Sequence, residues 1–177
     1  MKDGTTYYRA RFAGLNKDQA EAVCSYLKRN DVECVFVGPT ENIDTIGSEH
    51  VEKIKAHPEL FKLAGQVDRL RGLEILAGAD AFCLPSGDES QPIAPLEAAT
   101  LGVPCVLTDL PPYFGIWSHG RNCLLHPVGD TALLRWNLTA LLDDAKIRAR
   151  LIEGARGLLD RFTIGSFLQR FTAEMPP

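Results

Sequence analysis

The stretch ADAFCLPSGDESQPIAPLEAATLGVPCVLT, residues 79–108, decides the fold of this chain. Its first six residues, apolar except for Asp80, predict a buried strand, and the Pro-Ser-Gly that follows ends this strand. A helix is predicted from about Pro92 to Leu101, and the Gly-Val-Pro turn behind it leads into a second apolar strand at 105–108. Two such strands joined by a helix predict a βαβ unit, in which the strands run parallel.

The same alternation of strand and helix extends over the rest of the chain. Asp68 is expected to cap a helix that carries Leu70, Leu73 and Leu76 on one face. The sequence therefore predicts an α/β fold: a single Rossmann-like, doubly wound parallel sheet with helices on both faces, formed by residues 1–177 as one domain. A ligand is expected in the crevice at the carboxyl ends of the strands. The other predicted strands are 5–12, 32–37, 61–64 and 123–126, and the other predicted helices are about 16–29, 48–56, 131–142, 145–161 and 166–171.

Composition and charge exclude several classes of protein. The 177 residues carry a net charge of −4 and no basic stripe, so we expect no nucleic-acid partner. No apolar run approaches the ~18 residues of a membrane span, and the first residues are not followed by the apolar core of a signal peptide. The five cysteines form no C-x-x-C pair, which predicts reduced core thiols. These features predict a cytoplasmic protein without a transmembrane segment.

Two glutamates stand in the opening stretch, one before and one within the predicted helix. Glu89 is in the loop, and Glu97 is inside the following helix, eight positions later. At that spacing the two side chains do not stack on one helix face, so they would reach two points of one extended ligand. A carboxylate accepts two hydroxyl hydrogen bonds at once, which suits a polyhydroxylated ligand. The unsatisfied amides at the start of the helix would favour an anion nearby.

These residues resemble a known family. Leu84-Pro85-Ser86, the run from Glu89 to Ala98 and Gly102-Val103-Pro104 are similar to the donor-binding half of the group 1 glycosyltransferases, whose signature is two glutamates separated by seven residues. The run GRNCLL at 120–125, followed by Asp130, resembles a later landmark of the same half, and the resemblance covers roughly residues 5–171. It implies a retaining enzyme with two Rossmann-like domains, the GT-B fold, of which this chain would be one half.

The resemblance also implies a role for each candidate residue. Glu89 would be the catalytic residue beside the donor sugar, and Glu97 would bind the ribose of the nucleotide. Arg11 and Lys17 would neutralise the diphosphate, with a spacing one residue longer than usual and Asp18 where the family has glycine. Further donor-binding positions would be Gly38, Ser90, Gln91, Pro92 and Ile93, where Gln91-Pro92 replaces the usual Phe-Gly.

The implied activity is the transfer of a hexose from a nucleotide diphosphate donor, of UDP or GDP type, to an acceptor hydroxyl. The anomeric configuration would be retained, without a cofactor and without a metal, and the four histidines show no metal-ligand spacing. The N-terminal acceptor-binding domain of such an enzyme is missing from these residues. The chain would therefore be a piece of a longer protein or one part of a split enzyme, inactive alone, and peripheral membrane contact through the missing domain stays open.

Two alternatives to this activity remain from the residues alone. A non-catalytic nucleotide-binding or interaction module could use the same fold, because fold does not fix function. A nucleotide-sugar epimerase of the same architecture would need further catalytic carboxylates and histidines that the sequence does not place. For local structure, we expect Asp143-Asp144 to cap a helix junction, and Phe114 and Trp117 to be packing residues.

Overall fold

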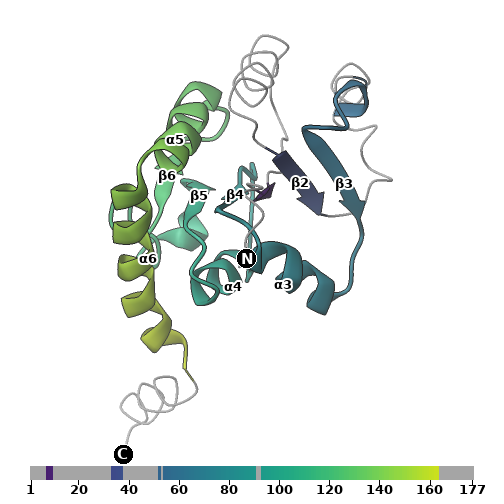
Figure 1. Cartoon of the computed structure of the whole chain (residues 1–177). Helices are drawn as coiled ribbons and strands as arrows, with labels where there is room; N and C mark the ends of the chain where they lie inside the picture. Colours follow the sequence, from purple (N-terminus) through teal and green to yellow (C-terminus); the bar gives the residue numbers. More distant parts are fainter. Residues whose placement is uncertain (1–6, 10–32, 38–51, 53, 91–92, 164–177) are drawn as a thin grey trace, which may run out of the picture.

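Six parallel strands form the centre of the molecule (Figure 1). The computed structural model describes residues 7–9, 33–37, 52, 54–90 and 93–163. Every pairing between neighbouring strands is parallel, which confirms the predicted α/β fold with a parallel sheet. In the order in which they lie in the sheet, the strands are β3 (Phe61–Gly65), β2 (Glu33–Val37), β1 (Tyr7–Arg9), β4 (Ala81–Leu84), β5 (Cys105–Thr108) and β6 (Leu124–His126).

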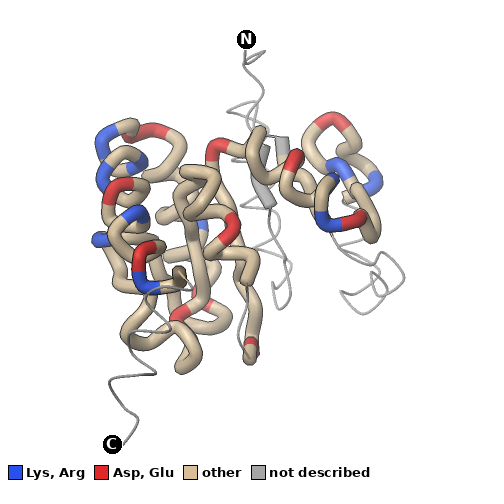
Figure 2. Tube along the Cα trace, turned by 90° about the horizontal axis from the view of Figure 1, so that it is seen from below, with Lys and Arg blue, Asp and Glu red and all other residues tan. Residues whose placement is uncertain are grey.

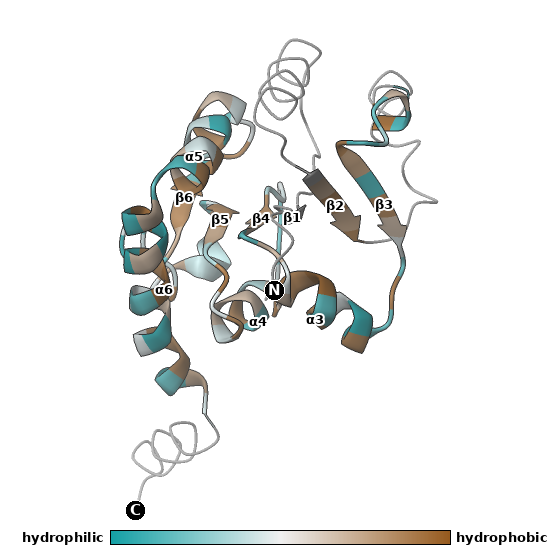
Figure 3. Ribbon diagram, viewed as in Figure 1, coloured by the Kyte–Doolittle hydropathy of each residue, from teal (hydrophilic) through white to brown (hydrophobic). Residues whose placement is uncertain are grey.

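Helices cover both faces of the sheet. Two consecutive residues of β5 point to opposite faces of the sheet and show this. Val106 shares a buried cluster with Leu134 of α5, whereas Leu107 shares another with Ala98 of α4. In Figure 3, α3, α5 and α6 each carry hydrophobic and hydrophilic stretches, as expected of helices that lie between a core and water. The described helices are α3 (Arg69–Ala77), α4 (Ala94–Thr100), α5 (Thr131–Asp143) and α6 (Ala145–Leu159), with the 3-10 turns η2 (Pro111–Tyr113) and η3 (Asp160–Phe162).

Aspartate side chains begin three of these helices. Asp68, Asp130 and Asp144 are the N-caps of α3, α5 and α6, and each carboxylate accepts from a backbone amide of the first turn. Asp144 accepts two such hydrogen bonds, from Lys146 N at 2.7 Å and from Ile147 N at 3.2 Å. Because Asp144 is also the C-cap of α5, it ends one helix and begins the next. The predicted cap at this junction is confirmed.

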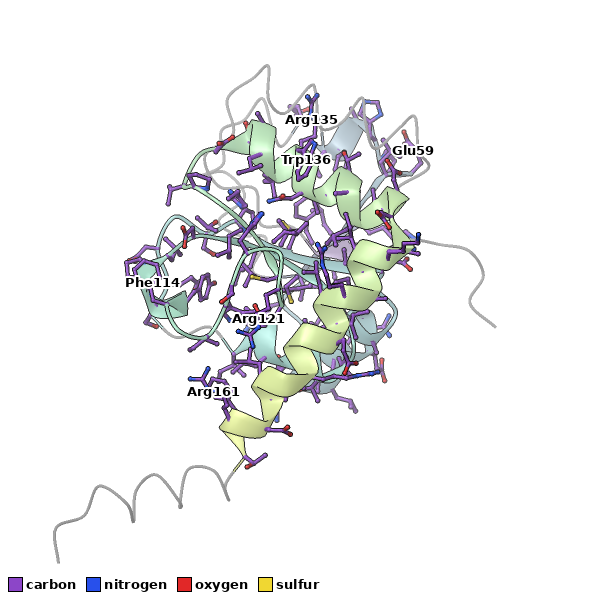
Figure 4. All side chains as sticks on the ribbon, turned by 90° about the vertical axis from the view of Figure 1, so that its left-hand side faces the viewer. Glu59, Phe114, Arg121, Arg135, Trp136 and Arg161 are labelled. Atoms are coloured by element: carbon purple, nitrogen blue, oxygen red, sulfur yellow. The ribbon has the colours of Figure 1, made fainter. Side chains whose placement is uncertain are left out.

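Four apolar side chains test the predicted packing. Leu76 of α3 is 1% exposed, but Leu70 is 70% exposed, so the prediction that both lie on one face of the helix is wrong. Steps of three residues rotate by about 60° around a helix, and two such steps turn Leu70 away from the sheet. In the loop after β5, Trp117 is buried as predicted, whereas Phe114 is 68% exposed and points outward (Figure 4).

The described cysteines are core residues. Cys34, Cys83, Cys105 and Cys123 are free and buried, which confirms the prediction of reduced core thiols for these four. Burial raises the pKa of the Cys123 thiol to about 12 and also raises the pKa of Cys83 and Cys105. Since the thiolate is the nucleophilic form of cysteine, these side chains contribute packing rather than chemistry.

The helix α6 lies tightly against the loop between β5 and β6. A Cβ atom built at Gly154 would lie 2.0 Å from the carbonyl oxygen of Arg121, which is closer than any side chain allows. In the turn η3, two residues after the end of α6, Arg161 donates through Nη1 to the carbonyl oxygen of Gly115 at 2.8 Å. Figure 4 shows Arg121 and Arg161 on this same side of the molecule. The contact at Gly154 therefore fixes the distance between the helix and a loop that starts at the carboxyl end of β5.

Charged side chains of both signs are interspersed along the described trace (Figure 2). Several pair with a neighbour on the same helix, such as Arg71 with Glu74 at 2.8 Å in α3 and Arg156 with Glu153 at 3.0 Å in α6. Exposed pairs of this kind contribute little to stability. Of the helices in the described ranges, none has both the length and the apolarity needed to cross a bilayer.

Candidate functional site

The strand order places a topological switch point between β1 and β4, at the carboxyl edge of the sheet. From the centre of the sheet, β1 leads outward to β2 and β3 on one side, and β4 leads to β5 and β6 on the other. The chain continues from the neighbouring strands β1 and β4 toward opposite sides of the sheet, and in folds of this kind ligands bind beyond the carboxyl ends of such strands. The loop at 85–90 follows β4 directly and therefore lies at this switch point.

Glu89 is held by a residue of its own loop, just after β4. Ser86, which is 9% exposed, donates through Oγ to Oε1 of Glu89 at 2.5 Å. A hydroxyl bound to a carboxylate at this distance makes a charge-assisted hydrogen bond. Glu89 is half-buried, whereas Asp88 beside it is exposed. The loop thus presents one oriented carboxylate at the switch point rather than two freely rotating charges.

Glu97 lies in the first turn of α4 and is bound by a residue of α3. Arg69 donates through Nε to Oε1 of Glu97 at 3.2 Å, and the side chain of Glu97 is only 23% exposed. The predicted ribose contact is therefore neither solvated nor isolated. Sequence reasoning missed Arg69, although a signal was present: a cation in the first turn of a helix opposes the helix dipole, so its placement there needs another reason.

Tyr113, in the turn after β5, is a buried residue that the sequence does not single out. Its side chain is 2% exposed, in the buried cluster that also contains Leu84 of β4 and Trp117. Among the described residues, no atom makes a hydrogen bond with its hydroxyl. Burial, followed by the charge of Glu89, raises the pKa of Tyr113 above its ordinary value. Burial therefore favours the neutral phenol.

The start of α4 has fewer free backbone amides for binding an anion than the sequence predicts. The helix has seven residues, and its N-cap, Ile93, makes no side-chain cap. Pro95 has no N–H, and the amides of Leu96 and Glu97 both donate to the carbonyl oxygen of Ile93, at 2.9 and 3.0 Å. The first turn has therefore already used most of its donors, and an anionic ligand would need cationic side chains in addition.

The structure describes four of the nine predicted site residues. Glu89 and Glu97 are half-buried and hydrogen-bonded, whereas Ser90 is exposed and Ile93 is 66% exposed at the start of α4. All four belong to the segment that follows β4, as the sequence predicts. The other five, Arg11, Lys17, Gly38, Gln91 and Pro92, lie outside the described residues.

Histidine and acidic side chains are dispersed in the described part of the chain. No three His, Cys, Asp or Glu residues are grouped there as a metal site would require. His119, in the loop before β6, accepts at Nδ1 from the backbone amide of Leu125 at 2.9 Å. This ring supports the local path of the chain.

Comparison with known proteins identifies relatives of this arrangement. Residues 13–158 match the model of a protein family described as "Glycosyl transferases group 1". A phosphatidyl-myo-inositol mannosyltransferase of Mycobacterium leprae is 32% identical over 105 residues, which are 59% of this chain and 28% of that protein. The protein of the same name from Mycolicibacterium smegmatis is 28% identical over 133 residues, 75% of this chain and 33% of that protein. The chain thus spans about a third of the length of the curated relatives it matches.

Solved structures share the fold. The Anabaena protein Alr3699/HepE, solved in complex with UDP, superimposes with a TM-score of 0.76 at 16% identity, over 96% of this chain and 48% of that one. Sucrose-phosphate synthase from Thermosynechococcus elongatus superimposes with a TM-score of 0.67 at 16% identity, over 97% of this chain and 47% of that one. In each case this chain corresponds to about half of a larger protein.

Proposed function

Because this chain belongs to the group 1 glycosyl transferases, we propose that residues 1–177 form a single domain that binds the nucleotide-sugar donor of a retaining hexosyltransferase. The acceptor would be a hydroxyl group held by a second, N-terminal Rossmann-like domain, supplied by the same polypeptide or by a separate chain. The proposal agrees with the lengths of the relatives, since this chain spans about half of the solved structures that it resembles. Alone, the domain would bind donor weakly and transfer little.

The observation that carries the proposal is the pair of oriented carboxylates after β4. Glu89 is fixed by Ser86, and Glu97 is fixed by Arg69 from the neighbouring helix. A nucleotide sugar has hydroxyl groups on the hexose and on the ribose, and carboxylates suit both because each oxygen accepts hydrogen bonds. We assign Glu89 to the sugar and Glu97 to the ribose.

The diphosphate between these two contacts needs positive charge. Negative charge builds up on the departing nucleoside diphosphate, and fixed cations stabilise it in the transition state. The first turn of α4 has few free amides, so the proposal gives this role to Arg11 and Lys17. Gly38, Ser90, Gln91, Pro92 and Ile93 complete the proposed donor contacts.

The chemistry requires little of the protein beyond positioning. We propose an oxocarbenium-like transition state in which the acceptor hydroxyl attacks the anomeric carbon from the same face from which the leaving group departs. Attack from this face retains the anomeric configuration. The departing phosphate itself takes the proton of the acceptor hydroxyl, so the bond to the sugar passes from one oxygen to another without an enzyme nucleophile. Glu89 orients the sugar during this exchange, and the reaction as proposed uses neither a metal nor a cofactor.

The names of the relatives suggest which sugar and which nucleotide make up the donor. The named function of the two curated relatives is mannosyl transfer, and the solved neighbour from Anabaena binds UDP and UDP-glucose. We therefore propose a hexose carried on UDP or GDP. A cytoplasmic location stays a prediction.

Calorimetric titration tests this function directly. The chain is titrated with UDP, GDP, ADP and their hexose conjugates, and we expect saturable binding of one nucleotide. Glu97→Ala should weaken the binding of both the free nucleotide and its sugar conjugate about tenfold, because a hydrogen bond to a charged group is lost. Glu89→Ala should weaken the binding of the sugar conjugate and leave the binding of the free nucleotide unchanged.

The matched control is Glu74→Ala. Glu74 is also a glutamate paired with an arginine, but it bonds within α3. We expect this variant to bind like the wild type. Binding that is equal in all the variants would favour a module without catalysis, and a chain that binds none of the nucleotides or conjugates would contradict the donor-binding role.

A further inference from the structure

A small hollow lies between the last turns of α6 and the loop that joins β5 to β6. Its volume is about 170 Å³, and it is lined by Gly154, Gly157 and Leu158 of α6 and by residues of the loop between positions 115 and 122. None of the nine predicted donor residues lines it. Sites for drug-sized ligands measure about 300–1,000 Å³, so this hollow suits a small ion, or one group of a larger molecule, rather than a nucleotide.

Two arginines from separate elements give the hollow its charge. Arg121 of the loop and Arg161 of η3 both line it, and Figure 4 shows them on the same side of the molecule. No acidic residue lines it: Glu153 of α6 pairs with Arg156 at 3.0 Å, and Asp160 is not among the lining residues either. The hollow is therefore a local surplus of positive charge on a chain whose net charge is −4.

Hydrogen bonds within the protein hold the polar groups of the hollow in place. Arg161 donates through Nη1 to the carbonyl oxygen of Gly115 at 2.8 Å, which orients its planar guanidinium group. Asn122 is 6% exposed, accepts at Oδ1 from the amide of Ser118 at 2.7 Å and donates through Nδ2 to the carbonyl oxygen of Ile116 at 3.0 Å. An amide nitrogen carries two hydrogens, so the buried Asn122 side chain keeps one donor beyond this bond.

This set of donors favours a tetrahedral anion. A guanidinium group binds two oxygens of a phosphate through parallel N–H bonds. Two guanidinium groups and an amide together need more acceptor oxygens than the two that a carboxylate offers. We propose that the hollow binds a phosphate group, carried by a soluble compound or by a lipid headgroup, with Arg121, Arg161 and Asn122 as its donors. This site is separate from the proposed donor contacts and goes beyond the proposed function.

Titration of the full chain with inorganic phosphate, at constant ionic strength, tests the site. We expect saturable shifts in the NMR spectrum, with the side-chain amide of Asn122 among the signals that move. Arg121→Gln and Arg161→Gln should each raise the Kd for phosphate at least about fivefold. Acetate should bind at least about fivefold more weakly than phosphate. A chain whose Asn122 signal does not respond to phosphate would overturn the proposal.

Two further variants separate the hollow from general charge and from misfolding. Arg150→Gln removes the same charge from an exposed position of α6 outside the hollow, so the Kd should not change. Nothing lies within 4 Å of a Cβ at Gly157, which lines the hollow, so Gly157→Leu should fold, occupy the space and abolish binding without a change of charge. Equal losses in Arg150→Gln and Arg161→Gln, or full binding in Gly157→Leu, would overturn the site.

Sedimentation with vesicles identifies the source of the phosphate group. Binding to phosphatidylcholine vesicles that contain phosphatidic acid, lost in Arg161→Gln and absent without phosphatidic acid, would assign it to a lipid. Binding of free phosphate without binding to these vesicles would assign it to a soluble compound. Glu97→Ala should leave the Kd for phosphate at Asn122 unchanged while it weakens nucleotide binding, so this site and the proposed function can fail independently.

Discussion

Arg69 in the first turn of α3 and Glu97 in the first turn of α4 are joined by a 3.2 Å hydrogen bond, although they are 28 positions apart in the chain. The bond links the helix that follows β3 to the helix that follows β4. It therefore ties the two sides of the switch point together. A ribose that binds Glu97 would meet a carboxylate that is already oriented, and it would have to share that carboxylate with a guanidinium group.

Removing the cation should affect binding more than stability. The Arg69 side chain is 80% exposed, and exposed ion pairs contribute about 0.2–1 kcal/mol, so Arg69→Ala should lower the free energy of unfolding by less than about 1 kcal/mol in urea titrations. The affinity for the nucleotide should fall about threefold, because Glu97 loses its orienting partner. Arg71→Ala is the control, since Arg71 pairs with Glu74 within α3 and should leave the affinity unchanged. Equal losses in both variants would speak against an orienting role.

The junction between α5 and α6 should depend on one of two adjacent aspartates. Asp144→Ala removes two hydrogen bonds to the first amides of α6, and loss of such a cap costs about 1 kcal/mol, or about 2–4 °C in Tm. Asp143 is exposed at the end of α5, where a negative charge opposes the helix dipole. Asp143→Ala should therefore leave Tm unchanged or raise it slightly. Calorimetric scans measure the Tm of both variants. A larger loss of Tm in Asp143→Ala than in Asp144→Ala would contradict the role of Asp144 as the cap.

Two glycines of α6 should respond in opposite directions to the same substitution. Gly154→Ala places a methyl group against the backbone of Arg121, and overpacking of this kind costs about 1–3 kcal/mol. Nothing lies within 4 Å of a Cβ at Gly157, so Gly157→Ala should stabilise the helix by up to about 1 kcal/mol. Urea unfolding of both variants tests this, and a neutral Gly154→Ala would mean that the loop is free to move away from the helix.

Acid should destabilise the protein through His126. This residue is buried at the end of β6, where desolvation lowers its pKa below 6.5, while the carbonyl of Pro127 and the charge of Asp130 act more weakly in the opposite direction. The unfolded chain then takes up a proton at a higher pH than the folded chain. The stabilisation from a neutral His126 is complete above pH 6.5 and is lost as the pH falls from 6.5 toward the folded pKa.

The measurement is the urea midpoint at about pH 7.5 and about pH 5.5 for the wild type and His126→Val. The wild type should lose more stability between these values than the variant does. The same loss in both proteins would assign the acid sensitivity to other groups.

Local signals explain which parts of the fold the sequence predicts well. The strand at 105–108 is confirmed without a shift, because a turn and a long loop bound a four-residue apolar run. The helices that follow Asp130 and Asp144 begin where predicted, because a cap acts on amides two or three positions away. Within one loop, by contrast, Trp117 is buried and Phe114 is exposed, and no local pattern separates two aromatic residues three positions apart.

The site shows the same division between near and distant contacts. The sequence predicts that Glu89 and Glu97 follow β4, and Ser86, the partner of Glu89, is only three positions away. Arg69 reaches this segment from another strand connection, so its position depends on the register of the whole sheet. The functions of the two glutamates stay predictions, because a carboxylate in a suitable place is consistent with more than one ligand.

The central position of β1 also governs how the sheet is completed as the chain is synthesised. The first strand of the sequence pairs with β2 on one side, but its other neighbour, β4, lies about 70 residues further along the chain. Closing such a long loop carries an entropic cost that local pairings do not. Until residues 81–84 leave the ribosome, one edge of β1 has no strand to pair with, and an open edge is where chains associate wrongly. Assembly of β4, β5 and β6 with their helices is therefore the step that protects the N-terminal half of the sheet.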